Sequence, residues 1–344
     1  MGVTKRFTPV GLLGTGGQGR VFAVKDAARG NAVLALKERS VSATEELRQE
    51  FELLCRLRHP NIAAVHDWLP VSPVADGDAE PQRSAYTQDL VAGKDLFTAL
   101  READPQQQAT AFEQVFRALA YLHAVQVVHL DLKPDNVLVH IGGAAVMARV
   151  LDFGVAERRG TRTDYVIGSR SYVAPERLRG DPVDPRADLY AVGVMMAEVS
   201  SGQPLSLYQH PELADAVARR EHLRGIGVSA DWLDTVVALT AFDPTERPGT
   251  VYEAAAGFEQ GIRRAVALHT PATVAAILRA GAPVGHESTV GDLAASAAQG
   301  GAHMLVGPSG SGRRTLARQV ARRLQLGGHE VEVWPGAPES QSTT

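Results

Sequence analysis

The hydrophobic pattern of this chain changes near residue 107, and this change most constrains the fold. Before it, short apolar runs alternate with glycine-containing turns, which predicts β-strands. After it, apolar residues recur at helical spacing, which predicts helices. A strand-rich front and a helix-rich back favour an α+β, two-lobed architecture with a site in the cleft at the join. The expected strands are 7–13, 21–24, 33–37, 62–68 and 86–91, and a helix with Leu47, Phe51 and Leu54 on one face is expected after the third strand. The later expected helices are 107–122, 188–200, 232–240 and 251–265.

Composition disfavours several classes of protein. The 344 residues suffice for two domains, and a hydrophobic fraction of 44% is ordinary for a globular protein. A net charge of −4 argues against a nucleic-acid partner on electrostatic grounds. The most apolar run, Ala191–Ala197, is far shorter than the roughly 20 residues of a membrane span, and the N-terminus lacks a secretory pattern. Cys55 is the only cysteine, so no internal disulfide is expected and a reducing cytoplasm is favoured. Because a membrane span and a secretory pattern are missing, we expect a cytoplasmic protein without a membrane partner.

Four polar residues stand close together just after the join. Asp131, Lys133 and Asn136 are followed, sixteen positions after Asn136, by Asp152. They supply two carboxylates, one ammonium and one carboxamide, which could hold a transferring phosphoryl group. Carboxylate and carboxamide oxygens also suit a hard cation such as Mg²⁺. Either aspartate alone could be an ordinary turn residue, but the spacing of all four indicates a site.

A glycine loop lies near the N-terminus, with Gly14, Gly16 and Gly19 before Val21. Alone it is a weak signal, because a plain turn or a dinucleotide-binding unit could share it. A helix should follow the glycines of a dinucleotide-binding unit, but an apolar strand follows here. This order favours a hairpin whose amides cover nucleotide phosphates. Lys37, at the end of the next apolar strand, supports that interpretation.

Together, the order Asp-x-Lys-x-x-Asn and the later Asp152-Phe153-Gly154 resemble the catalytic and metal-binding loops of protein kinases, over about residues 5–265. The resemblance implies a two-lobed kinase fold that moves the γ-phosphoryl group of ATP onto proteins. It implies that Asp131 accepts or orients the hydroxyl proton and that Lys133 stabilises the charge on the phosphoryl group. Asn136 and Asp152 would hold magnesium ions.

The resemblance also implies a set of nucleotide contacts. Lys37 would reach the α- and β-phosphates, oriented by Glu50, which we prefer to Glu45, Glu46 and Glu52 as its partner. The remaining contacts come from the glycine loop, the adenine pocket and the backbone that faces the base. In that order they are Leu13, Gly14, Gly16 and Gly19; Val21, Ala35 and Leu138; and Asp89 with Val91.

Other residues resemble structural positions of kinases. Arg247 would pair with Glu176, and Asp188 would brace the catalytic loop. We expect His59 and His123 to be structural as well.

The residues around the catalytic loop resemble the serine/threonine branch, and the glycine loop is similar to bacterial members. One position departs from the pattern: Leu130 stands where kinases usually carry an arginine that receives an activation-loop phosphate. Leucine cannot bind an anion. We therefore expect catalysis not to depend on phosphorylation of Thr161, Thr163 or Ser169.

The C-terminal part has a different character. Residues 266–283 are rich in Ala, Pro and Gly and are expected to be a linker. Within 284–344, Met304–Val306 is predicted to be a strand. The glycine-containing residues 307–312 predict a loop, and the residues after them predict a helix. This resembles a P-loop of NTPases, but Arg313 and Arg314 replace its lysine and hydroxyl residue. We expect a small, partial and degenerate α/β P-loop-like segment, the start of an ATPase module or a docking place for a partner.

Three functional classes follow from these features. The first is a serine/threonine protein kinase that uses ATP and Mg²⁺ in bacterial signalling. The second is a catalytically silent pseudokinase scaffold. The third is a kinase-like sensor of a signalling ATPase. The presence of every catalytic position favours the first.

Overall fold

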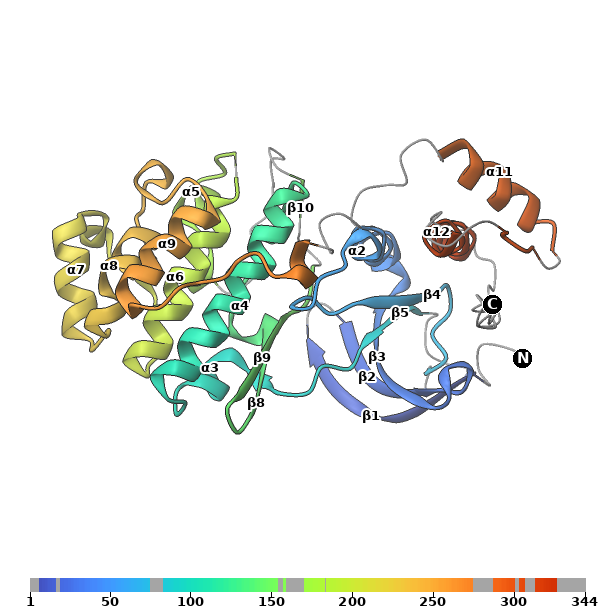
Figure 1. The fold of residues 1–344 in the computed structure, drawn as a ribbon, viewed down its shortest axis with the longest axis horizontal. Helices are drawn as coiled ribbons and strands as arrows, with labels where there is room; N and C mark the ends of the chain where they lie inside the picture. Colours follow the sequence, from blue (N-terminus) through green and yellow to red (C-terminus); the bar gives the residue numbers. More distant parts are fainter. Residues whose placement is uncertain are drawn as a thin grey trace, which may run out of the picture. The chain divides into compact units, whose positions relative to one another are not determined.

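The structure is a computed structural model that describes residues 6–16, 19–74, 83–153, 157–158, 170–182, 184–274, 287–300, 303–306 and 313–326. The chain divides into two compact units, shown as a ribbon in Figure 1. The first unit comprises residues 1–51, 65–88 and 281–344, and the second comprises 52–64 and 89–280. The division falls within a helix and at the end of a strand.

A five-stranded sheet dominates the first unit, in the order β1-β2-β3-β5-β4 (Figure 1). Strands β1, β2 and β3 form an antiparallel meander, and the tight β1–β2 connection carries the glycine loop. Helix α2 (Thr44–Arg56) follows β3 and buries Leu47 and Phe51 completely, as its apolar spacing requires. The strands are β1 (Phe7–Gly16), β2 (Gly19–Asp26), β3 (Ala32–Ser40), β4 (Val65–Leu69) and β5 (Arg83–Asp89).

Helices build most of the second unit. The expected helices after residue 107 are confirmed, with shifted ends: α9 stops at Ile262, three residues before the expected end. Helix α6 is the central one, because every residue from Ala187 to Val199 is buried. Its apolar run, too short for a membrane span, is thus the middle of the core. The helices are α3 (Leu96–Leu100), α4 (Pro105–Ala124), α5 (Pro175–Leu178), α6 (Arg186–Ser201), α7 (Ala216–Gly225), α8 (Ala230–Leu239) and α9 (Val251–Ile262).

Short strands of the second unit frame the expected catalytic loop. The hairpin of β8 (Val137–Gly142) and β9 (Ala145–Val150) begins directly after Asn136 and packs on α4. Its last strand therefore leads to Asp152. Strand β6 (Lys94–Asp95) extends this sheet, while β7 (Val127–Val128) pairs with β10 (Glu157–Arg158).

The segment after α9 lies against α4. The buried Glu113 carboxylate accepts the Ala267 N–H at 3.3 Å and pairs with Arg264 at 2.9 Å. Arg117 donates to the Ala267 carbonyl at 2.6 Å, and Leu268 is buried. The described part of the expected linker, residues 266–274, thus belongs to the second unit.

The C-terminal helices α11 (Glu287–Ala297) and α12 (Arg313–Leu326) pack on each other in the first unit. Helix α12 confirms the helix expected after residue 312. The strand expected at Met304–Val306 is wrong: these residues form no strand, and Met304 and Val306 are largely exposed. A strand forms only where its backbone pairs with a neighbouring strand, and none of the described residues pairs with these three. The glycine-containing residues 307–312 lie outside the described residues.

Within the described residues, no helix is both long and apolar enough to cross a membrane.

Candidate functional site

Lys37 and Glu50 form a buried ion pair in the first unit. The Lys37 ammonium lies 2.8 Å from Glu50 Oε1 and 3.1 Å from Oε2. The two residues are 5% and 3% exposed. Tyr86 of β5 donates its hydroxyl to Glu50 Oε1 at 2.9 Å, so the carboxylate is held from two sides. The expected choice of Glu50 among the acidic residues of α2 agrees with this geometry.

The residues of the glycine loop differ in what their positions demand. Gly19 has a φ of 117°, and a Cβ there would lie 2.1 Å from the Glu38 carbonyl oxygen. Only glycine therefore fits. A Cβ at Gly14 would have no neighbour within 4 Å, so nothing in the described chain excludes a larger residue. Leu13 is exposed, and Gly16 pairs with Gly19 across the turn.

Two residues expected in an adenine pocket lie on neighbouring strands of this sheet. Val21 of β2 is paired directly with Lys37 of β3, and it is half-buried. Ala35 lies two residues before Lys37 on β3 and is buried. The register thus places Val21 and Lys37 side by side on one sheet.

In the second unit, Asp131, Lys133 and Asn136 come together. One oxygen of the Asp131 carboxylate, Oδ2, accepts from Lys133 Nζ and from Asn136 Nδ2, each at 2.9 Å. Asn136 Nδ2 also donates to the Asp131 carbonyl at 2.7 Å. These contacts use the nitrogen of the Asn136 amide and leave its Oδ1 as a hydrogen-bond acceptor.

A fully buried carboxylate on α6 braces this loop. Asp188 accepts the backbone N–H of His129 and of Leu130, each at 2.9 Å, and contacts His123 Nε2 at 2.9 Å. Burial alone would raise the pKa of the Asp188 carboxyl, but the His123 contact and the amide hydrogen bonds hold it below its ordinary value. The structural roles expected of Asp188 and His123 agree with these contacts.

His129 connects the loop to the strand before Asp152. Its Nδ1 accepts the Asp131 N–H at 3.3 Å, so its Nε2 carries the hydrogen and donates to the Leu151 carbonyl at 3.0 Å. The Leu151 N–H in turn donates to the Asn136 carbonyl at 2.8 Å. These bonds set Asp152, the next residue, close to Asn136.

The remaining expected nucleotide contacts of the second unit are Leu138, Asp89 and Val91. Leu138 on β8 and Val91 are half-buried. The Asp89 N–H donates to the Ala64 carbonyl at 2.9 Å, and its carboxylate pairs with Arg149 of β9 at 3.3 Å. Arg149 is the register partner of Leu138.

Glu176 and Arg247 form the expected buried pair through two parallel hydrogen bonds of 2.7 Å. Arg247 also donates to the Ala241 carbonyl at 2.7 Å and stacks over the Tyr190 ring at 5.0 Å. The pair ties α5 to the residues before α9. Its near-complete burial explains why these residues would matter for folding.

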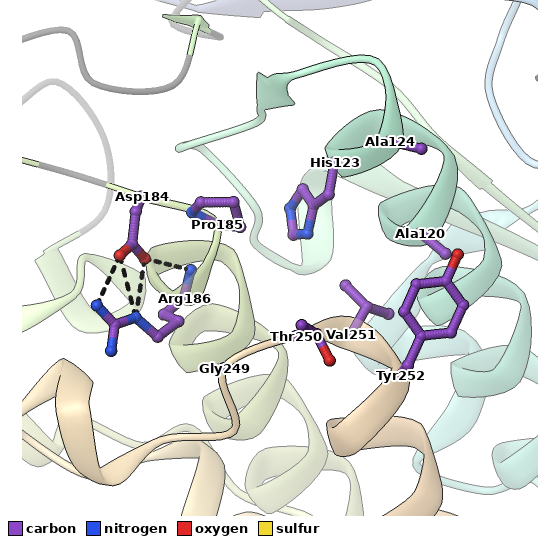
Figure 2. Close-up of a pocket in the computed structure, with 10 residues that line it drawn as sticks. All are labelled: Ala120, His123, Ala124, Asp184, Pro185, Arg186, Gly249, Thr250, Val251 and Tyr252. Carbon is purple, nitrogen blue, oxygen red and sulfur yellow. Dashed lines mark hydrogen bonds and ion pairs between the residues drawn. The ribbon is translucent and has the colours of Figure 1, made fainter.

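A separate cavity of about 300 Å³ opens between the end of α4, the residues before α6 and the start of α9 (Figure 2). Its wall includes His123, Val251 and Tyr252, and the ion-paired Asp184 and Arg186 flank it in Figure 2. None of the expected site residues lines it. Its link to the catalytic loop is the contact of His123 with Asp188.

The side-chain oxygens of the catalytic loop and of Asp152 suit a hard cation. The Asn136 carboxamide presents oxygen, and Asp152 adds a carboxylate. Across the described residues, no three His, Cys, Asp or Glu side chains gather as a metal-ligand group. The residues present therefore fit Mg²⁺ held together with phosphate oxygens, since Mg²⁺ usually takes only one or two protein ligands.

A glycine hairpin before a buried Lys–Glu pair, and an Asp-Lys-Asn loop braced by an α6 aspartate, define a protein kinase. Residues 7–255 match the family described as protein kinase domain, so the chain belongs to this family.

Curated relatives carry the same family name. The chain is 31% identical to a Corynebacterium efficiens protein named as a probable serine/threonine-protein kinase, over 77% of this chain and 42% of that protein. It is 36% identical to the serine/threonine-protein kinase PkaA of Streptomyces coelicolor, over 50% of this chain and 32% of that protein. For PknA of Mycobacterium tuberculosis the identity is 34%, over 56% and 46%. The chain thus spans less than half the length of these relatives.

Three residues that the sequence did not single out contact the site. Tyr86 holds Glu50, Arg149 pairs with Asp89, and Arg177 of α5 donates to the Leu130 carbonyl. Each contact joins residues more than 30 positions apart, so no local pattern indicated it.

Proposed function

We propose that this protein is a serine/threonine protein kinase that transfers the γ-phosphoryl group of ATP to hydroxyl groups of proteins. The single observation that carries the proposal is the contact of the Asp131 carboxylate with both Lys133 Nζ and Asn136 Nδ2. It sets a candidate proton acceptor, a cation and a metal-ligating amide within one hydrogen-bonded group. Family membership and the names of the relatives support the assignment.

Each side chain then has a role. Asp131 orients the acceptor hydroxyl and takes its proton as the new bond to phosphorus forms. Lys133 stabilises the negative charge on the transferring group. In the first unit, Lys37 binds the α- and β-phosphates and Glu50 keeps its ammonium in place.

Asn136 and Asp152 would hold Mg²⁺. When bound, the ion neutralises the charge on the phosphate oxygens. We assign adenine contacts to Val21, Ala35 and Leu138. The backbone of Asp89 and Val91 and the glycine loop with Leu13, Gly14, Gly16 and Gly19 complete the nucleotide set.

We further propose that the protein acts in cytoplasmic signalling. The single cysteine, Cys55, is buried and forms no disulfide, which suits a reducing compartment. We place the kinase domain from residue 5 to beyond 265, because the contacts of Arg264 and Ala267 with α4 support an end after residue 267. For 284–344 we retain the partial P-loop-like segment as a proposal, supported by the helix α12 that follows its glycines.

One comparison tests the function: phosphate transfer to casein from labelled ATP, located by mass spectrometry, for wild type and Asp131→Asn. We expect transfer to serine or threonine by wild type and a loss of at least about a hundredfold in the variant. Wild-type protein that binds ATP without any transfer would instead identify a scaffold.

The same assay includes a control for the C-terminal segment. Gly312→Asp should leave transfer unchanged. ATP turnover without protein phosphorylation, lost in Gly312→Asp and kept in Asp131→Asn, would favour the signalling ATPase.

A further inference from the structure

Leu130 adopts a backbone conformation that its residue type disfavours. Its φ is 64°, in the left-handed region where a Cβ is crowded. Such a conformation persists when its surroundings hold it from several sides. The residue directly precedes Asp131, so its backbone determines where the Asp131 side chain begins.

The peptide between Leu130 and Asp131 is held at both of its polar groups. Its carbonyl oxygen accepts from Arg177 Nη1 at 2.5 Å, and its N–H, which belongs to Asp131, donates to His129 Nδ1 at 3.3 Å. The preceding N–H, of Leu130, donates to Asp188. Arg177 and His129 thus hold the Leu130–Asp131 peptide at both of its polar groups, and Asp188 holds the peptide before it.

Arg177 differs from the other two groups because it comes from outside the catalytic loop and its brace. It lies in the first turn of α5, next to Glu176, and is only 4% exposed. The Glu176–Arg247 pair anchors that turn through two hydrogen bonds. The turn that carries Arg177 is therefore held in place, which fixes the position from which Arg177 donates to the Leu130 carbonyl. A hydrogen bond with a charged donor is roughly twice as strong as a neutral one.

We propose that Arg177 is a positioning residue for phosphoryl transfer, which holds the Leu130–Asp131 peptide and through it aims the Asp131 carboxylate. The inference rests on the proposed kinase function. Arg177 is buried and acts through its hydrogen bond to the Leu130 carbonyl. Its removal lowers the rate of transfer and leaves nucleotide binding, which uses other residues, as it was.

The test compares Arg177→Met and Arg177→Lys with the matched control Arg179→Met in the full chain. Arg179 lies two residues further on, is about half-exposed and pairs only with the exposed Asp181 among described residues. For each protein, kcat and KM for ATP with casein, the melting temperature and hydrogen exchange of residues 129–136 are measured.

We expect Arg177→Met to lower kcat at least about tenfold with KM for ATP within about twofold, and to speed exchange at the Asp131 amide. Arg177→Lys, which keeps the charge, should restore part of kcat, and Arg179→Met should match wild type. Unchanged kcat in a folded Arg177→Met protein overturns the inference.

Two further outcomes distinguish positioning from a structural role and from a failure of the kinase function itself. If ATP binding and the melting temperature fall together with kcat in both Arg177 variants, the role of Arg177 is purely structural. That outcome also overturns the inference. Absence of transfer by wild type overturns the proposed function and this inference together. Transfer by wild type that Arg177→Met does not alter overturns this inference alone.

Discussion

At the scale of single residues, Lys37 and Glu50 show how burial and function coincide. Both charges are almost completely removed from water, and they lie in direct contact with each other. A buried charge that loses its partner keeps the cost of desolvation without the compensation. Stability and the proposed phosphate binding therefore depend on the same contact.

This pairing predicts the outcome of a double-mutant cycle. Lys37→Met should lower the free energy of unfolding by about 3–5 kcal/mol, because Glu50 then stays buried without its cation, although the Tyr86 hydroxyl still donates to it. The double variant Lys37→Met/Glu50→Leu should recover much of that stability and none of the activity. Urea unfolding of wild type, Lys37→Met, Glu50→Leu and the double variant checks this. Additive losses would contradict the coupling.

The two glycines Gly14 and Gly19 give a second prediction. Gly19→Ala should cost about 1–3 kcal/mol from its positive φ alone, and the clash with the Glu38 carbonyl adds to this. Gly14→Ala should leave the melting temperature within about a degree, because its Cβ meets nothing in the described chain. Both should weaken ATP binding, measured by titration calorimetry. Normal ATP binding by Gly14→Ala would remove Gly14 from the proposed phosphate contacts.

At the scale of elements, His59 links the turn after α2 to α4. Its ring stacks on Tyr121 at 5.1 Å, and the Tyr121 hydroxyl accepts the Arg58 N–H at 2.8 Å. Burial, aided by the nearby Arg117 charge, lowers the pKa of His59 from 6.5 to about 4. The folded protein thus keeps this ring neutral where the unfolded chain would protonate it.

The lowered pKa sets the direction of a pH effect. The contribution of His59 is fully present above the unfolded pKa of 6.5 and is lost as the pH falls toward about 4. Between pH 6 and 5 wild type should lose up to about 1 kcal/mol more unfolding free energy than His59→Gln, in which nothing titrates there. Chemical unfolding at several pH values measures both slopes. Equal slopes would refute the assignment.

At the scale of the whole molecule, the structure bears on how the enzyme would be controlled. The backbone N–H and carbonyl of Leu130 are already bound by Asp188 and Arg177, and its apolar side chain is buried. The expected phosphorylation sites Thr161, Thr163 and Ser169 lie outside the described residues. The contacts of Leu130 nonetheless support a loop that is ordered without a phosphate.

The corresponding prediction concerns all three sites at once. Replacing Thr161, Thr163 and Ser169 by alanine should leave kcat within about threefold of wild type. Dephosphorylated wild-type protein serves as the comparison, assayed with casein. Abolished transfer in a variant with an unchanged melting temperature would show that phosphorylation is required.

The sequence predicted the candidate catalytic residues better than the residues that hold them in place. Asp131, Lys133 and Asn136 stand within six positions, so their chemistry was visible together. Helix α4 followed from apolar spacing. Helix α7 was missed because it buries only one apolar residue, Leu223, and therefore shows no apolar periodicity. Its other buried residue is Arg219, whose guanidinium donates to backbone carbonyls. Long-range contacts such as Arg177 with Leu130 leave no local trace, and the strand at Met304–Val306 failed because pairing partners decide strands.

The segment that follows α9 has a practical consequence for protein engineering. A shortened protein that ends at residue 255, where the family match stops, would strip Arg264 and the Ala267 amide from the buried Glu113. It would also remove the buried Leu268. We expect such a fragment to aggregate when expressed. A fragment that extends to residue 274 keeps the contacts of Arg264 and Ala267 with α4.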